Sequence, residues 1–333
     1  MKNYINNLII LIGLSITFFY KLKYQRKFIK KTLAVDIAES KKTNDNTLDD
    51  QDYKKITDYY GYAVPAILGE SYCILRGKKM SLKERYAITY LGGLTGLFDD
   101  FFDKKNLPEN YIKNLINKPN NLVSKNSNER LFNKFYKKAL ENSANSNLIK
   151  SYFLKVLEAQ ILSKKQICPE IKQNETRRIT LLKGGISILF YRSNFSEYMC
   201  EEEKMMLYKL GGIGQLENDI FDVYEDYKDG TRTLVTTEKK INNLRETYIS
   251  LMKEVFELVY KTNYPVKNKK AFLRIVSLVI CRGFVCLDKL EKNEKLTDNH
   301  FSIENYVRKD LICDMSKPIN FLKAINYYAK YNT

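Results

Sequence analysis

Three aspartates at helical spacing, Asp99, Asp100 and Asp103, stand among phenylalanines in this 333-residue chain. Asp99 and Asp103 are four residues apart, so on a helix their carboxylates share one face, with Cβ atoms about 5–6 Å apart. They close a predicted helix, where carboxylates meet the negative end of the helix dipole. A cation would offset that cost. All-oxygen ligands suit Mg²⁺, which takes one or two protein carboxylates and keeps water or phosphate oxygens as its other ligands.

A second oxygen-rich column follows at Asn218, Asp222 and Asp226, again in steps of four residues. These side chains are expected to line one helix face over two turns, and Gly230 is typical of a helix end. Either motif alone is typical of a solvated acidic face. Two such columns, both in helices rich in glycine and aromatic residues, indicate a pair of metal-binding motifs.

Composition limits the chemistry of such sites. The chain has one histidine, His300, and its six cysteines include no C-x-x-C pair. Most Ser-His-Asp triads and all sites that need several histidines are therefore excluded. Any catalysis must rest mainly on carboxylates, cations or hydroxyls.

At these motifs the sequence resembles the class I isoprenoid synthases, which include trans-prenyltransferases and terpene cyclases. Residues 99–103, Asp-Asp-Phe-Phe-Asp, match the first motif of that superfamily, D-D-x-x-D. Residues 214–222 are similar to the second prenyltransferase motif, but Asn218 stands where its first aspartate would be, as in terpene cyclases. Asp222 and Asp226 take the Ser/Thr and Glu positions of the cyclase motif. The second motif is therefore a hybrid.

The resemblance implies Mg²⁺-dependent ionisation of a prenyl diphosphate. Three Mg²⁺ ions would bind the diphosphate and assist its departure, leaving an allylic carbocation in an apolar cavity. The implied catalytic residues are Asp99, Asp103 and Asn218. The implied metal ligands are Asp99, Asp100, Asp103, Asn218, Asp222 and Asp226. Cations that would complete the diphosphate site are Arg178, Lys183, Lys228 and Arg232, and aromatic residues that would line the cavity are Phe98, Phe102, Tyr191 and Phe195.

Departures from the family pattern bear on the subtype. Chain-elongating members bind a second diphosphate through a G-G-K-R-x-R-P segment, whose nearest match here, residues 76–80, lies too close to Asp99 along the chain. This favours a terpene synthase, a cyclase or diphosphate lyase with one substrate. A chain-elongating polyprenyl diphosphate synthase stays the alternative, since the Arg-Tyr pair of cyclases has no clear match. A non-catalytic, membrane-anchored helical binding protein is the alternative of another class.

The elements that must position these motifs are predicted to be helices. Apolar residues recur at three- and four-residue steps from about residue 53 onward, and alternating strand-like stretches are missing. The pattern predicts an all-α fold with an N-terminal apolar helix and one large helical domain over 56–333, which the resemblance implies is of the isoprenoid-synthase type. The predicted helices are 53–75, 81–103, 108–117, 128–143, 146–166, 175–193, 200–229, 239–262, 268–291 and 302–329, the last broken near Pro318.

The N-terminal segment, residues 1–37, is apolar and then basic. Residues 4–20 are long enough to reach the lower limit for spanning a bilayer. Lysines and Arg26 follow, and the positive-inside rule then places the rest of the chain in the cytoplasm. The segment predicts an anchor or surface helix at the inner face of a membrane, with a buried core helix and a signal peptide as alternatives. Residues 38–55 are polar without periodicity and predict a linker.

Charge alone does not identify the partner. The net charge is +17, of which residues 1–48 carry nine basic minus three acidic groups, or +6. No zinc finger, RNP or helix-turn-helix signature accompanies this charge, so a nucleic-acid binder ranks behind an anionic small molecule. The expected partners are a prenyl diphosphate, a membrane surface and, in a homodimer, a second copy of the chain.

Overall fold

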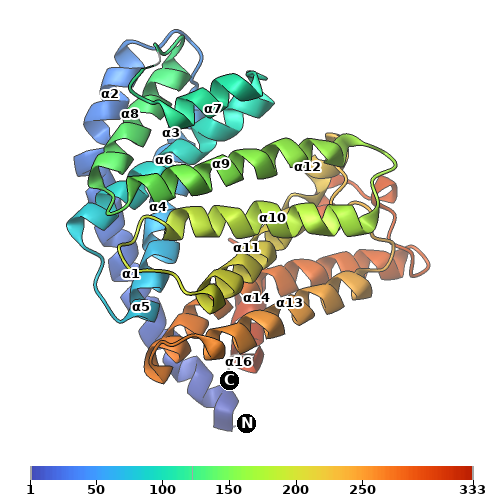
Figure 1. Cartoon of the computed structure of the whole chain (residues 1–333). Helices are drawn as coiled ribbons and strands as arrows, with labels where there is room; N and C mark the ends of the chain where they lie inside the picture. The colour runs from blue at the N-terminus through green and yellow to red at the C-terminus, as the bar shows by residue number, and fades with distance from the viewer. Residues whose placement is uncertain (1, 122, 332–333) are drawn as a thin grey trace. The chain divides into compact units, whose positions relative to one another are not determined.

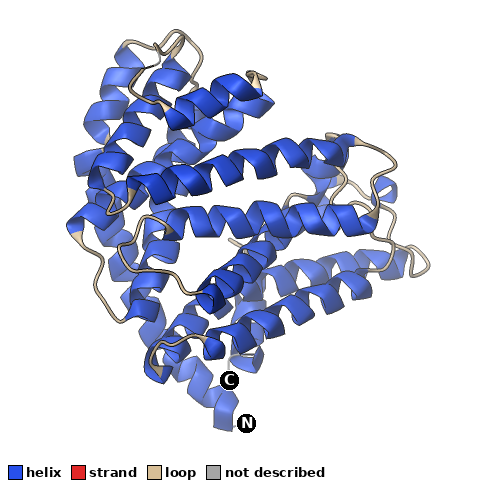
Figure 2. Cartoon of the chain, in the orientation of Figure 1, coloured by secondary structure: helices blue, strands red, loops and turns tan. Residues whose placement is uncertain are grey.

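The computed structural model describes residues 2–121 and 123–331 (Figure 1). Every regular element in this part of the chain is helical (Figure 2), which confirms the all-α prediction and the N-terminal apolar helix. The elements are α1 (Lys2–Thr32), α2 (Ala34–Lys42), α3 (Asp50–Lys54), η1 (Lys55–Tyr60), α4 (Gly61–Ala63), η2 (Val64–Gly69), α5 (Glu70–Arg76), α6 (Leu82–Asp103), α7 (Glu109–Asn117), α8 (Ser127–Asn142), α9 (Ser146–Ser163), η3 (Lys164–Ile167), α10 (Gln173–Arg192), α11 (Glu201–Phe221), α12 (Val223–Lys228), α13 (Ile241–Lys261), α14 (Val266–Leu296), η4 (Ile303–Asn305), α15 (Arg308–Leu311) and α16 (Pro318–Tyr331).

The predicted helix over 200–229 is divided at one residue. The backbone of Asp222, with φ −95° and ψ 10°, leaves the helical region and separates α11 from α12. Its carbonyl still accepts from the Asp226 N–H at 2.9 Å, so the chain continues in nearly the same course. Gly230, with φ +71°, follows α12 as predicted for a helix end.

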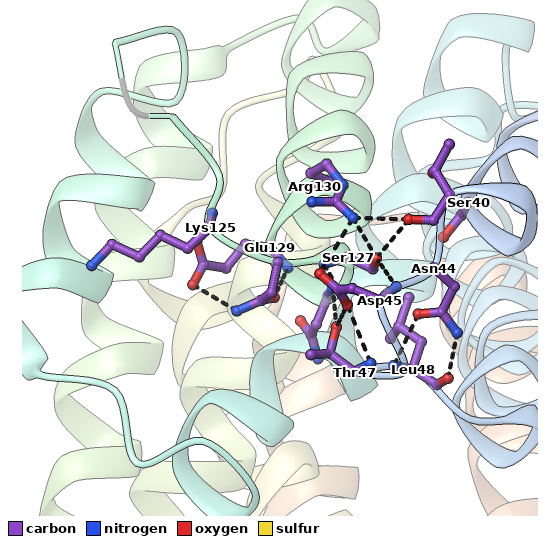
Figure 3. A network of polar contacts seen from close by, with 12 residues as sticks. Ser40, Asn44, Asp45, Thr47, Leu48, Lys125, Ser127, Glu129 and Arg130 are labelled. Carbon is purple, nitrogen blue, oxygen red and sulfur yellow. Dashed lines mark hydrogen bonds and ion pairs between the residues drawn. The ribbon is translucent and has the colours of Figure 1, made fainter.

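Residues 38–55, predicted to be a linker, are ordered by polar contacts and contain the end of α2 and all of α3. Asp49 caps α3 and exchanges side-chain-to-backbone hydrogen bonds with Asp52. Figure 3 shows the neighbouring network, in which the Asp45 carboxylate accepts from the Thr47 hydroxyl at 2.6 Å and from the Ser127 N–H. The Thr47 hydroxyl is the main cause that lowers the pKa of Asp45 to about 2.

Contacts divide the chain into two compact units. The N-terminal unit comprises residues 13–157 and 190–198. The C-terminal unit comprises the described residues up to 12, residues 158–189, and those from 199 onward. The first acidic motif lies in the N-terminal unit and the second in the C-terminal unit.

An aromatic core holds α6 in the N-terminal unit. Ser81 and Glu84 form a capping box that starts the helix. Further along it, the Phe98 ring packs on Phe102 and on Phe153 of α9, with centroids 5.4 and 5.0 Å apart. Such aromatic pairs stabilise beyond the area they bury. The core therefore fixes the end of α6 that carries the aspartates.

Glycines bring α10 and α11 into backbone contact in the C-terminal unit. A Cβ on Gly184 would overlap the carbonyl oxygen of Gly211, and a Cβ on Gly211 would overlap that of Gly184. Only glycine permits this approach, because the obstacle is backbone and cannot rotate away. The contact sets the spacing between the helix that carries Lys183 and the helix that carries the second motif.

α1 is the single helix of the described chain that is long and apolar enough to cross a membrane. The candidate span is Tyr4–Thr32, with mean hydropathy 1.6, and 11% of its most apolar window is buried. This assignment of α1 as a candidate span rests on its length and composition alone. Core helices and signal sequences meet the same criteria.

The glycine contact predicts a large loss of stability on a minimal change. Gly184→Ala should lower the free energy of unfolding by about 2–3 kcal/mol, because the added methyl forces α10 and α11 apart. Urea denaturation followed by circular dichroism measures this loss.

Gly214→Ala is the matched control on α11. A Cβ there meets nothing within 4 Å, so the change should stabilise by about 0.5–1 kcal/mol through helix propensity. Equal effects at the two positions would contradict the packing role of Gly184.

Candidate functional site

The first motif presents one polar helix face in the N-terminal unit. Thr95, Asp99 and Asp103 follow one another in steps of four on α6, where Asp99 is half-buried and Asp103 exposed. The Tyr191 hydroxyl shares a hydrogen bond of 2.6 Å with Thr95. Burial raises the pKa of Tyr191, and the negative charge of Asp99 adds to the rise. Tyr191 is thus a neutral hydroxyl beside Asp99.

Asp100 belongs to a different environment. Its carboxylate is buried, forms an ion pair with Lys104 at 3.2 Å and accepts from the Asn128 amide at 3.4 Å. Lys104 also pairs with Asp52 at 2.6 Å. Burial, and then the charge of Asp52, raise the pKa of Asp100. To bind a metal ion, Asp100 would therefore have to give up its contacts with Lys104 and Asn128.

The predicted cavity residues are buried, and their contacts are those of core packing. Phe98 lies within the aromatic core, and Phe102 packs against it. Phe195 packs on Tyr72, with ring centroids 5.5 Å apart, and under the guanidinium of Arg76 at 4.5 Å. Of the four residues, Tyr191 is the one with a described contact to the Thr95 and Asp99 face.

The second motif gathers three carboxylates at the junction of α11 and α12. Asn218 donates from its amide to the Asp222 carboxylate at 2.9 Å. The charges of Asp219 and Asp222 both act on Asp226, one turn further on. Asn218 thus contacts Asp222, and Asp226 lies near enough to Asp222 for their charges to interact.

Asp219 is a member of this acidic cluster that sequence reasoning omitted. It is buried, and its two carboxylate oxygens accept from the Gln215 amide at 2.8 Å and from the Thr180 hydroxyl at 3.3 Å. The available signal was its spacing, because Gln215, Asp219, Asp222 and Asp226 follow the helical steps of four, three and four. We call Asp219, Asp222 and Asp226 the acidic cluster.

The acidic cluster carries more negative charge than its surroundings offset. Burial raises the pKa of Asp219 to about 6, against the Gln215 hydrogen bond and the charge of Lys183. Burial, and then the charges of Asp219 and Asp222, raise the pKa of Asp226 to about 7, with Lys183 opposing. Burial also raises the pKa of Asp222. A cation placed nearby would stabilise the ionised form of these carboxylates.

The four predicted diphosphate-binding cations occupy different environments. Lys183, on α10, is half-buried and near enough to influence the pKa values of Asp219 and Asp226. Arg178 lies at the surface, where Glu175 accepts from it twice, at 2.8 and 2.9 Å. Lys228 is exposed at the end of α12.

Arg232 is held by its backbone, which exchanges hydrogen bonds with Gln166. The Arg232 Nε is buried and makes no hydrogen bond within the described chain. A buried donor without a partner is costly. An anionic ligand that reached it would remove that cost.

The chemistry of this donor set fits Mg²⁺. The donors are carboxylate and amide oxygens. Their negative charge is opposed by the charge of Lys183. Among the described residues, no three histidine, cysteine, aspartate or glutamate side chains are grouped so that they could hold a metal together. Mg²⁺ in phosphate-binding sites commonly uses one or two carboxylates, with water and phosphate as its remaining ligands. Asp222 and Asp226, with Asn218, are the residues that would hold it in this unit.

The nearest match to a second-substrate segment is engaged in the protein. Arg76 is buried and pairs with Glu84 at 3.0 Å and with Glu197. Lys78 pairs with Glu197 at 2.8 Å. These carboxylates already neutralise the cations that would meet a second diphosphate.

Comparison with family models, curated proteins and solved structures finds no match for the chain.

The raised pKa of Asp226 predicts a pH-dependent stability with a definite sign. A carboxyl group whose pKa is about 7 in the folded chain and 3.8 when unfolded loses stabilisation as pH rises between those values. Asp226→Asn should therefore be more stable than the natural chain at about pH 8, by about 1–2 kcal/mol after screening at a half-buried group, and equal to it near pH 4. Urea denaturation at the two pH values measures the difference.

Asp314→Asn provides a control of opposite sign. The Ser316 hydroxyl lowers the pKa of Asp314, so its neutral replacement should lose stability at about pH 8. If Asp226→Asn destabilised the chain at this pH, the account of the acidic cluster would be wrong.

Proposed function

We propose that this protein is a Mg²⁺-dependent class I isoprenoid enzyme that ionises a prenyl diphosphate. The observation that carries the proposal is the acidic cluster, in which the charges of buried Asp219 and exposed Asp222 act on half-buried Asp226 and the charge of Lys183 opposes them. A local excess of negative charge is what a site for a metal–diphosphate complex requires. The resemblance of both aspartate motifs to this superfamily supplies the reaction class, and the described chain is all-helical, as that class requires.

The residues have separable roles in this proposal. Asp222, Asp226 and Asn218 would hold Mg²⁺, and Asp99 and Asp103 would do the same in the first motif. When bound, Mg²⁺ would supply positive charge to offset that of the leaving diphosphate. Lys183 donates to the diphosphate oxygens, and Arg232 offers its free Nε–H. Gln215 and Thr180 keep Asp219 buried and position it behind the metal ligands.

A terpene synthase, a cyclase or diphosphate lyase, is the favoured subtype. A chain-elongating synthase needs free cations for a second diphosphate, and Arg76 and Lys78 are paired with Glu84 and Glu197. Elongation remains the alternative outcome of the assay below. We further propose that the enzyme works in the cytoplasm at the inner face of a membrane, with α1 as the membrane-contacting element.

The test is diphosphate release by the full-length chain. Purified protein with Mg²⁺ should release diphosphate from geranyl, farnesyl or geranylgeranyl diphosphate. The allylic cation that remains should lose a proton to give a linear or cyclic hydrocarbon, or be captured by water to give an alcohol. Added isopentenyl diphosphate should leave the product unchanged, whereas a longer prenyl diphosphate would identify an elongating synthase. Binding of all three substrates without turnover would identify a non-catalytic binding protein and end the proposal.

Single substitutions test the roles proposed for the acidic residues. Asp99→Ala and Asp226→Asn should each lower kcat at least about a hundredfold, because each removes charge that holds the metal–diphosphate complex. Glu225→Gln is the matched control on α12, since Glu225 is exposed and pairs with Arg308. Its turnover should stay within about twofold of the natural chain.

A further inference from the structure

α1 exposes a continuous stripe of large apolar side chains. Ile5, Ile9, Ile12, Ile16 and Phe19 follow one another in steps of four and three, so they share one helix face. Each of them is at least half exposed. A helix of a water-soluble protein normally turns such a stripe inward. We call these five residues the apolar stripe.

The same face becomes basic toward the end of the helix. Lys23, Lys27 and Lys30 continue the steps of four and three, and all are exposed. No acidic residue occurs in α1. One helix face is therefore apolar over its first five turns and cationic over the next two.

The opposite face of α1 packs into the protein through apolar side chains such as Leu11 and Phe28 and through two buried amides. In the C-terminal unit, the Asn7 amide donates to the Ala329 carbonyl of α16 at 3.0 Å. In the N-terminal unit, Gln25 is completely buried, donates to the Thr89 hydroxyl at 3.0 Å and accepts from Arg85 at 2.9 Å. These bonds hold α1 along its length, and a helix that crossed a bilayer would have to break them.

Further apolar side chains are exposed beside the start of α1. The Tyr4 hydroxyl donates to Asn326 of α16 at 3.0 Å, within the C-terminal unit. The preceding turn of α16 carries Ile319 and Leu322, both about three-fifths exposed. Lys323 beside them is exposed as well.

We infer that α1 lies in the plane of an anionic lipid surface, with the apolar stripe in the acyl-chain boundary and its lysines on the headgroups. Helices of this composition bind membranes in this way, and each lysine near anionic lipid adds to the affinity. A second copy of the chain is a poorer occupant, because its stripe would place lysines against lysines or against isoleucines. The inference is independent of the proposed reaction, since binding needs no substrate.

The first test is flotation of the full-length chain with vesicles. It should bind vesicles that contain phosphatidylglycerol and bind pure phosphatidylcholine weakly. Replacing Lys23, Lys27 and Lys30 by glutamate should weaken binding by more than about tenfold. Replacing the exposed Lys253, Lys267 and Lys270 by glutamate makes the same change in net charge and should have less than about a threefold effect. Equal losses for both sets would overturn the inference.

The second test exploits the absence of tryptophan from the chain. Single variants Ile5→Trp, Ile12→Trp and Phe19→Trp should each shift to shorter emission wavelength on anionic vesicles. All three should be quenched best by lipids brominated near the headgroup. Leu82→Trp, at an exposed position elsewhere, should not change.

The remaining outcomes of the tryptophan test contradict the inference. Deepest quenching at Ile12→Trp with shallow quenching at the other two would mean that α1 crosses the bilayer. No shift at any stripe position would mean that lipid does not cover it. Because these positions are exposed, unchanged circular dichroism of each variant shows that the fold is intact.

Discussion

The approach of α10 to α11 is the constraint on which the C-terminal unit depends. Peptide backbones meet at Gly184 and Gly211, and no side chain intervenes. Helices at ordinary spacing, separated by side chains, would hold Lys183 and Thr180 further from the motif on α11. Close contact instead lets Thr180 reach Asp219 and brings the charge of Lys183 to bear on the acidic cluster. The two glycines have no reactive side chain. They contribute to the site by setting the short distance between α10 and α11.

Electrostatic imbalance distinguishes the acidic cluster from the other buried charges. In the N-terminal unit, Asp36 is buried but has Lys134 and Lys138 within 3.0 and 2.6 Å. Glu217 is buried on α11 too, and burial raises its pKa to about 7, yet Arg282 lies 3.1 Å away. Such pairs are typical of structural charges. In the acidic cluster, by contrast, the charges of Asp219 and Asp222 both raise the pKa of Asp226, a pattern common at functional sites.

Helix positions could be predicted from sequence because apolar periodicity reports the buried face directly. Residues 38–55 lack that signal, since their order comes from local caps such as Asp49 and from contacts to Ser127, far away in sequence. Asn218, Asp222 and Asp226 were found through their equal spacing. Asp219 was passed over because it departs from that spacing by one residue, although its charge acts on Asp226. The division into two units depends on tertiary contacts, which periodicity does not contain.

α1 and its partner α16 lie far apart along the chain. Tyr4 and Asn326 are 322 residues apart, so the first turns of α1 leave the ribosome long before α16 exists. Contacts of such high sequence separation form late and slowly. Until α16 has been made, the hydrogen bond between Asn7 and the Ala329 carbonyl cannot form. α1 is therefore synthesised before this partner, and in that interval a bilayer or a chaperone can bind the helix.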